Sequence, residues 1–174
     1  MHLETARLVI VPQSLALVET RLEHDDFRLE VAGVGVVQFG AEFPGDSLMF
    51  YPGMRDYLRA GGALSPGGVV IERAIREAIG EIGCKGDPVG GVADIGYGFN
   101  RSVWGRGYAT EAVAAFSDWL LSSPEINAVT ANTAVTNGAS GRVLEKCGFV
   151  RVGTGFDPDE GDLILWRKAK PDAV

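Results

Sequence analysis

Short apolar runs alternate with amphipathic stretches along the chain, and Gly and Pro separate the two kinds of segment. Runs of four to eight residues rich in Val, Ile and Thr favour extended backbone. They predict seven strands, at residues 5–12, 69–73, 78–84, 91–99, 126–133, 149–155 and 162–168. The three strands between 69 and 99 are separated by turn-like segments, which favours an antiparallel meander.

Apolar residues three or four positions apart predict helices, because this spacing places them on one helix face. Leu15, Val18, Leu22 and Leu29 predict a helix after the first strand. A second helix follows residue 108 and is stopped by the Ser-Ser-Pro at 122–124, and a third spans 138–147, closed by Gly148. Residues 33–68 are rich in Gly and Pro, which indicates mostly loop with a short helix around 54–59.

The order of these elements predicts an α/β or α+β fold with a mixed sheet. The chain has 174 residues and no internal repeat. This length is typical of one domain, so we expect a single domain over 1–174 with one core and one site.

Charge and composition exclude several classes of function. Sixteen Lys and Arg against 23 Asp and Glu give a net charge of −7, which argues against nucleic-acid binding. No apolar run is long enough to span a membrane, and the N-terminal residues do not resemble a signal peptide, so we expect a cytoplasmic protein. Cys84 and Cys147 lack metal-ligand spacing, so we expect reduced thiols and no metal site.

The stretch RSVWGRGYATEA, residues 101–112, places two glycines directly before a predicted helix. Backbone N–H groups and the positive end of the helix dipole at such a place suit phosphate oxygens. Gly105 and Gly107 carry no side chain that would block the approach, and Arg106 adds charge at the rim. A P-loop would need Lys and Ser or Thr, and a dinucleotide motif would need Gly where Thr110 stands. A turn that simply joins a strand to a helix is the alternative.

The segments WGRGYATEA and NGASGRVLEKCGF, about 25 residues apart, resemble the GNAT superfamily of N-acetyltransferases. Within it they resemble the RimJ/RimL-type subgroup, the ribosomal-protein N-terminal acetyltransferases. The resemblance implies a mixed, mostly antiparallel sheet of six or seven strands with helices on both faces. It also implies acetyl-CoA as co-substrate, no metal, and direct transfer to an amine on a protein N-terminus or a small molecule. It leaves a homodimer open.

The same resemblance implies which residues hold the cofactor. Its pyrophosphate would lie on the turn formed by Trp104, Gly105, Arg106, Gly107, Tyr108 and Ala109. Trp104 departs from the general pattern, which has Gln or Arg at this position. Further cofactor residues implied are Phe99, Thr110, Asn132, Asn137 and Ser140. Asn137 is also a preferred residue type for capping a helix.

Acetyl transfer requires a base for the amine proton and help for the departing thiolate. Asp94, in the strand before the turn, ranks first as the base, and Glu81, one strand earlier, ranks second. Because no Tyr follows Tyr108, Ser140 is expected to hydrogen-bond the thiolate. A catalytically idle acyl-CoA-binding or sensory module on the same fold is the alternative.

Overall fold

The computed structural model describes residues 1–170, which form two compact units. Unit 1 comprises Met1–Gly83 and Tyr97–Tyr108, and unit 2 comprises Cys84–Gly96 and the residues from Ala109 onward. The strand β7 (Val92–Phe99) begins in unit 2 and ends in unit 1.

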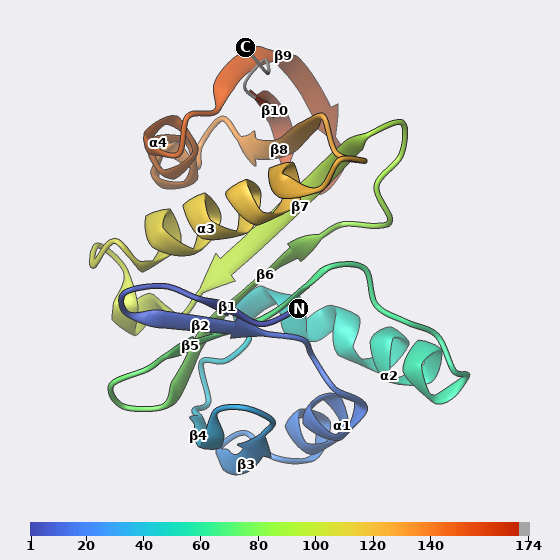
Figure 1. The fold of residues 1–174 in the computed structure, drawn as a ribbon, viewed down its shortest axis with the longest axis vertical. Helices are drawn as coiled ribbons and strands as arrows, with labels where there is room; N and C mark the ends of the chain where they lie inside the picture. The colour runs from blue at the N-terminus through green and yellow to red at the C-terminus, as the bar shows by residue number, and fades with distance from the viewer. Residues whose placement is uncertain (171–174) are drawn as a thin grey trace. The chain divides into compact units, whose positions relative to one another are not determined.

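Four strands of unit 1 run in the order β1-β2-β5-β6 (Figure 1). They are β1 (Leu3–Glu4), β2 (Leu8–Val11), β5 (Gly67–Glu72) and β6 (Glu77–Cys84). Neighbouring strands in this order are antiparallel. A separate hairpin of β3 (Phe27–Val31) and β4 (Gly35–Phe39) adjoins β6 in parallel at Gln38.

Two helices pack side by side in unit 1, α1 (Leu15–Glu23) and α2 (Tyr51–Arg59) (Figure 1). Ser14 caps α1, because its side chain accepts a hydrogen bond from the Leu17 backbone N–H at 3.2 Å. Pro52 stands in the first turn of α2, where its missing N–H costs no helical hydrogen bond. A 3₁₀ segment, Gly45–Phe50, leads directly into α2.

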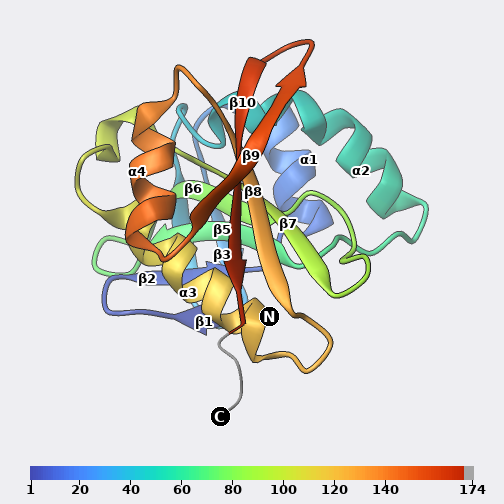
Figure 2. The same cartoon turned by 90° about the horizontal axis from the view of Figure 1, so that it is seen from above.

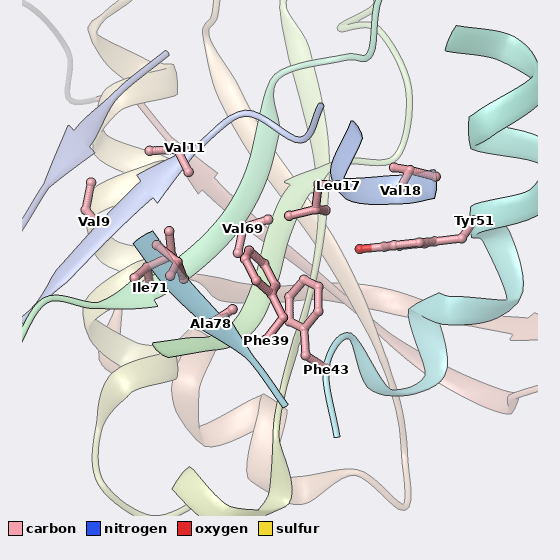
Figure 3. Close-up of a cluster of buried hydrophobic side chains, with 11 residues drawn as sticks. Val9, Val11, Leu17, Val18, Phe39, Phe43, Tyr51, Val69, Ile71 and Ala78 are labelled. Carbon is pink, nitrogen blue, oxygen red and sulfur yellow. The ribbon is translucent and has the colours of Figure 1, made fainter. Parts of the chain in front are cut away.

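The core of unit 1 joins its strands to both helices, and Figure 3 shows it in close-up. Phe39 lies in its interior, with its ring stacked on Phe27 at 4.9 Å and edge-on to Phe43 at 5.2 Å. Around these three rings pack apolar side chains from β2, β5, β6, α1 and α2, which are Val9, Val11, Val69, Ile71, Ala78, Leu17, Val18 and Tyr51.

Unit 2 contains β8 (Ala128–Ala134), β9 (Val150–Asp157) and β10 (Gly161–Ala169), and Figure 2 shows these strands side by side. The start of β7 pairs in parallel with β8, whereas β8, β10 and β9 pair antiparallel in that order. The helices are α3 (Tyr108–Ser122), which starts at the end of unit 1, and α4 (Gly138–Lys146).

One face of β10 carries both helices of unit 2. The ring of buried Trp166 would lie 3.2 Å from a Cβ at Gly141, so α4 approaches the strand closely at this glycine. Two residues along and therefore on the same face, Lys168 donates to Ser117 Oγ of α3 at 3.0 Å. The opposite face of this sheet carries the side chains of Asn132 and Leu165, which lie directly across from each other.

The expected fold class is confirmed, with a mixed, mostly antiparallel arrangement and four α-helices among the described residues. All seven predicted strands occur, as β2 and β5 to β10, and β1, β3 and β4 add three that the resemblance did not imply. The expectation of one domain over 1–174 stays a prediction.

Two local expectations were wrong. Leu29 lies in β3 and not on the first helix, because α1 ends at Glu23 and half-buried Phe27, Leu29 and Val31 alternate with exposed residues. The segment 33–68 holds more structure than its Gly and Pro content indicates. It contains β4, and α2 begins at Tyr51, three residues before the expected start.

The aromatic core predicts that substitutions at two positions of β4 change the free energy of unfolding by very different amounts. Phe39→Ala should lower the free energy of unfolding by about 3–5 kcal/mol, because it leaves a cavity beside two aromatic rings. Val36→Ala, on the same strand at a residue that is 50% exposed, is the control and should change it by less than about 1 kcal/mol. Urea unfolding measures both, and equal losses would contradict the assignment of Phe39 to the core.

Candidate functional site

The glycine-containing turn lies in unit 1, between the end of β7 and the start of α3. Gly105 has φ 76° and Gly107 has φ 79°, a left-handed region that glycine enters without steric cost. Among the described residues, a Cβ on Gly105 would meet no atom within 4 Å, and one on Gly107 would meet an Arg7 guanidinium nitrogen at 3.5 Å. The backbone of this turn is therefore open to a ligand.

The charge of a ligand that suits this turn follows from the helix that begins here. The first four N–H groups of an α-helix have no partner within the helix, and its N-terminus carries a partial positive charge. Because α3 begins at Tyr108, directly after Gly107, the turn presents such groups beside an open backbone. This geometry suits an anion such as a phosphate.

The segment leading into the turn is held from two sides. Asn100 is buried, and its backbone and side-chain N–H groups donate to the β6 carbonyls of Ile79 and Ala78 at 2.9 and 3.2 Å. Ser102 donates from its backbone N–H and its hydroxyl to Glu42 Oε2 at 3.2 and 2.7 Å. These bonds lower the pKa of the exposed Glu42 carboxyl, because they stabilise its charged form.

Trp104 folds back over the segment it follows. Its indole Nε1 donates to the backbone oxygen of Phe99 at 2.8 Å, while the side chain stays 63% exposed. The Arg101 guanidinium lies 5.8 Å from the Trp104 ring centroid. Trp104 thus restrains the outer side of the turn, and its ring leaves the glycine backbone uncovered.

Tyr108, the first residue of α3, is buried between two charged residues. Its hydroxyl donates to Glu72 Oε1 at 2.7 Å, and the Arg7 guanidinium lies over its ring at 4.3 Å. The hydrogen bond to Glu72 is the main cause that raises the pKa of Tyr108. The Arg7 side chain also donates to the Arg106 carbonyl at 2.9 Å.

Glu81 lies half-buried in β6 of unit 1, within a cluster of polar side chains. Its Oε1 accepts hydrogen bonds from Gln13 Nε2 and from the hydroxyl of Tyr51, which is fully buried. Ser47 is a third hydrogen-bonding neighbour. Burial raises the pKa of Glu81 to about 7, although the three hydrogen bonds act in the opposite direction. A carboxyl group with this pKa can exchange a proton near neutral pH.

Tyr51 holds its own proton firmly. Burial and the neighbouring Glu81 carboxylate raise the pKa of its phenol, so it acts as a hydrogen-bond donor to that carboxylate.

Asp94 lies in unit 2 in a more polar setting. Thr130 Oγ1 donates to its Oδ1 at 3.0 Å, Lys85 Nζ is 3.8 Å from its Oδ2, and its side chain is 46% exposed. Lys85 also donates to the side-chain oxygen of Asn132, which ties two of the predicted site residues together. Asp94 is register partner to Thr130, so this cluster lies on the Asn132 face of the sheet, opposite to the face that carries α3 and α4.

The other predicted residues of unit 2 lie at helix ends. Asn137 caps α4, because its Oδ1 accepts from the backbone N–H of half-buried Ser140 at 3.1 Å. Ala109 and Thr110 form the first turn of α3, and the Thr110 carbonyl accepts from Cys147 Sγ at 3.3 Å. The cap confirms the structural role that the residue type of Asn137 predicts.

Neither cysteine is a ready nucleophile, because burial raises the pKa of Cys84 to about 11 and also raises that of Cys147. Within residues 1–170, no group of three or more His, Cys, Asp and Glu could hold a metal ion. In the same range, no helix is long and apolar enough to cross a membrane.

The structure thus gathers the predicted residues into separate groups. Unit 1 holds Glu81 and the turn as far as Tyr108, and unit 2 holds Asp94 with Asn132, and Asn137 with Ser140. Sequence reasoning missed the residues that surround these groups, namely Arg7, Gln13, Ser47, Tyr51, Glu72 and Lys85. None of them stands in a recognisable motif, and only Pro52, which favours a helix start at Tyr51, was a local signal.

Two curated proteins show similarity to about half of the chain. The Uncharacterized N-acetyltransferase YjdG of Bacillus subtilis (strain 168) is 32% identical over 83 residues, 47% of this chain and 49% of that protein. The Uncharacterized N-acetyltransferase p20 of Bacillus licheniformis is 33% identical over 98 residues, 55% of each protein. The matched segment therefore spans about half the length of each relative.

Solved structures share the fold over nearly the whole chain. A GNAT-family acetyltransferase from Bacillus anthracis superposes with a TM-score of 0.69 at 20% identity, covering 98% of this chain and 99% of that one. The ribosomal L7/L12 alpha-N-protein acetyltransferase RimL, in complex with coenzyme A, superposes with a TM-score of 0.66 at 15% identity, covering 97% and 98%. The TM-scores show a shared fold, and identities of 20% and 15% show nothing beyond the fold.

The family model of the acetyltransferase (GNAT) domain matches residues 17–150. This range is more than half of the chain, and it includes β6 with Glu81, β7 with Asp94, the open glycine turn and the Asn137 cap. The match and the fold agree with the two motifs on either side of β8, and the protein belongs to the GNAT acetyltransferase family.

Proposed function

We propose that this protein transfers an acetyl group from acetyl-CoA directly to a primary amine. The observation that carries the proposal is the pair of left-handed glycines, Gly105 and Gly107, whose open backbone leads into α3. Such a turn suits the pyrophosphate of acetyl-CoA, since backbone N–H groups and the helix dipole both favour phosphate oxygens. Acetyl-CoA then supplies the reactive thioester.

The residues proposed to hold the cofactor are those expected from the motifs. The backbone from Trp104 to Ala109 would bind the pyrophosphate, with Arg106 at its rim and Phe99 and Thr110 at its ends. Asn132, Asn137 and Ser140 are proposed as further cofactor residues on the family resemblance. The Trp-Gly-Arg-Gly turn also supports placing the protein in the RimJ/RimL-type subgroup.

Glu81 is the base that its surroundings favour. The attacking amine must lose a proton as its nitrogen bonds to the thioester carbonyl carbon, and a carboxylate with a pKa of about 7 is suited to accept it. Asp94, the residue that the sequence ranks first as the base, has Lys85 Nζ 3.8 Å from its Oδ2 and accepts a hydrogen bond from the Thr130 hydroxyl. When the C–S bond breaks, the CoA thiolate would be hydrogen-bonded by Ser140.

The acceptor is proposed as a protein N-terminus or a small-molecule amine in the cytoplasm. The competing proposal, an idle acyl-CoA-binding or sensory module, predicts binding without turnover. The two proposals are separated by measuring free CoA from acetyl-CoA with a panel of N-terminal peptides, polyamines, amino acids and aminoglycosides. We expect CoA release above the amine-free background with at least one class. Binding of acetyl-CoA without release for any amine would favour the idle module.

A valine at the turn tests its role. Gly107→Val should raise the KM for acetyl-CoA by about tenfold or more, because a branched side chain at positive φ displaces the backbone that would hold phosphate. Gly61→Val is the matched control, since Gly61 also has positive φ and open space around it but lies after α2. Steady-state kinetics with both variants measures the difference. An unchanged KM in Gly107→Val would exclude the turn as the phosphate site.

The pKa of Glu81 predicts a dependence of stability on pH. The folded protein holds the Glu81 proton up to about pH 7, whereas the unfolded chain releases it near 4.5, so ionisation opposes folding as the pH rises through this window. Replacing Glu81 with Gln, which does not ionise, removes this pH-dependent loss of stability. Relative to wild type, Glu81→Gln should gain up to about 3 kcal/mol of unfolding free energy between about pH 4.5 and 7.

Urea unfolding of both proteins across this pH range measures the gain. A stability difference that stays constant with pH would contradict the raised pKa.

In the CoA-release assay, Glu81→Gln should lower kcat by about 10²–10⁴-fold while acetyl-CoA affinity is kept. Asp94→Asn is the parallel variant, and a larger loss there would assign the base to Asp94.

A further inference from the structure

The backbone of Arg7 is fixed at the point where β1 returns into β2. The Thr5 N–H donates to the Leu8 carbonyl at 2.9 Å, and the Leu8 N–H donates to the Thr5 hydroxyl at 2.9 Å, which closes a tight turn around Arg7. The Arg7 carbonyl in turn accepts from the Arg73 N–H at 2.9 Å. The side chain of Arg7 therefore leaves a defined position at the start of β2.

From this position the guanidinium of Arg7 reaches three consecutive residues of the glycine turn. Its Nη1 donates to the Arg106 carbonyl at 2.9 Å, and its Nη2 lies 3.5 Å from the place of a Cβ on Gly107. Its Cζ lies 4.3 Å from the centre of the Tyr108 ring. A planar guanidinium can donate from its edge and stack with its face at the same time, which an ammonium group cannot do.

Glu72 holds the ring on which Arg7 stacks. It accepts the Tyr108 hydroxyl at 2.7 Å, and it is the register partner of Leu8, the residue next to Arg7. The turn before β2 thus contributes one residue above the Tyr108 ring, and the strand β5 contributes one at its hydroxyl. Both contacts lie within unit 1, so the start of α3 is attached to the sheet at its first residue.

We propose that Arg7 is a positioning residue for the cofactor turn, and this rests on the proposed role of that turn. The guanidinium bonds the carbonyl of Arg106 and thereby fixes the peptide that precedes Gly107. This keeps the neighbouring N–H groups directed toward the phosphate position. Arg7 also adds a fixed positive charge beside the turn, which favours the same anion.

The test compares Arg7→Ala and Arg7→Lys with Arg73→Ala. Arg73 is the matched control, because its side chain donates to the Thr5 carbonyl and pairs with Glu4, so both of these partners lie in the same hairpin and outside the glycine turn. Acetyl-CoA affinity is measured by calorimetry at low and high salt, and KM and kcat are measured in the CoA-release assay. Urea unfolding of each variant shows whether it is folded.

Arg7→Ala should raise the Kd and KM for acetyl-CoA by about tenfold, with kcat within about twofold of wild type and a weaker dependence of Kd on salt. Arg7→Lys keeps the charge and loses the combined bond and stack, so its Kd should rise by about threefold while its salt dependence stays near that of wild type. Arg73→Ala should leave the Kd unchanged. If Arg7→Ala does not fold, Arg7→Lys carries the test.

Two results would overturn the inference: an acetyl-CoA affinity within twofold of wild type in both Arg7 variants, or an equal loss in Arg73→Ala, which would show a general effect of the hairpin. Failure of the proposed function has a different signature. In that case the wild-type protein itself would not bind acetyl-CoA.

Discussion

The backbone between β7 and α3 can form its turn because the glycines at positions 105 and 107 both adopt a positive φ. A residue with a side chain would strain the backbone there, and two such residues in succession around Arg106 would do so twice. The outcome is a short turn with an uncovered backbone at the start of α3. The hydrogen bonds of Asn100 hold the turn at its entry, and the contacts of Arg7 hold it at its exit. The anion site that we propose for this turn would depend on backbone N–H groups, so its side chains could vary, and Trp104 could stand where the wider family pattern has Gln or Arg.

Two carboxylates of similar intrinsic acidity lie in very different surroundings. Glu81 is half-buried in unit 1 with Gln13, Tyr51 and Ser47 as hydrogen-bonding neighbours, and burial raises its pKa to about 7. Asp94 faces a half-exposed position with the Lys85 ammonium and the Thr130 hydroxyl beside it. Desolvation favours the neutral form of the Glu81 carboxyl group, so its proton can exchange near neutral pH. This raised pKa supports Glu81 as the proposed proton acceptor.

Patterns along the chain predicted the elements where one periodicity dominates. The β-branched runs predicted all seven strands, β2 and β5 to β10. The spacing of apolar residues predicted α3, and Gly148 marked the end of α4. The pattern failed where two periodicities overlap. Leu29 fits helical spacing with Leu22, yet it also alternates with Phe27 and Val31, and pairing with β4 decided in favour of a strand. In residues 33–68, Gly and Pro concealed β4 and the start of α2, although Phe39 of β4 and Tyr51 of α2 both pack in the core of unit 1.

By itself, the sequence determined the fold class, the family resemblance and the glycine turn, because each of these is encoded by neighbouring residues. Positive φ at Gly105 and Gly107 and the cap at Asn137 are local properties of the backbone. The tertiary structure decided the surroundings of each carboxyl group, since Glu81 meets Gln13 and Tyr51, which are 68 and 30 positions away in the sequence. It likewise decided that Arg7 contacts a carbonyl 99 positions away. The physical reason is that desolvation, hydrogen bonding and charge pairing depend on which groups meet in space, and spacing along the chain does not encode those meetings.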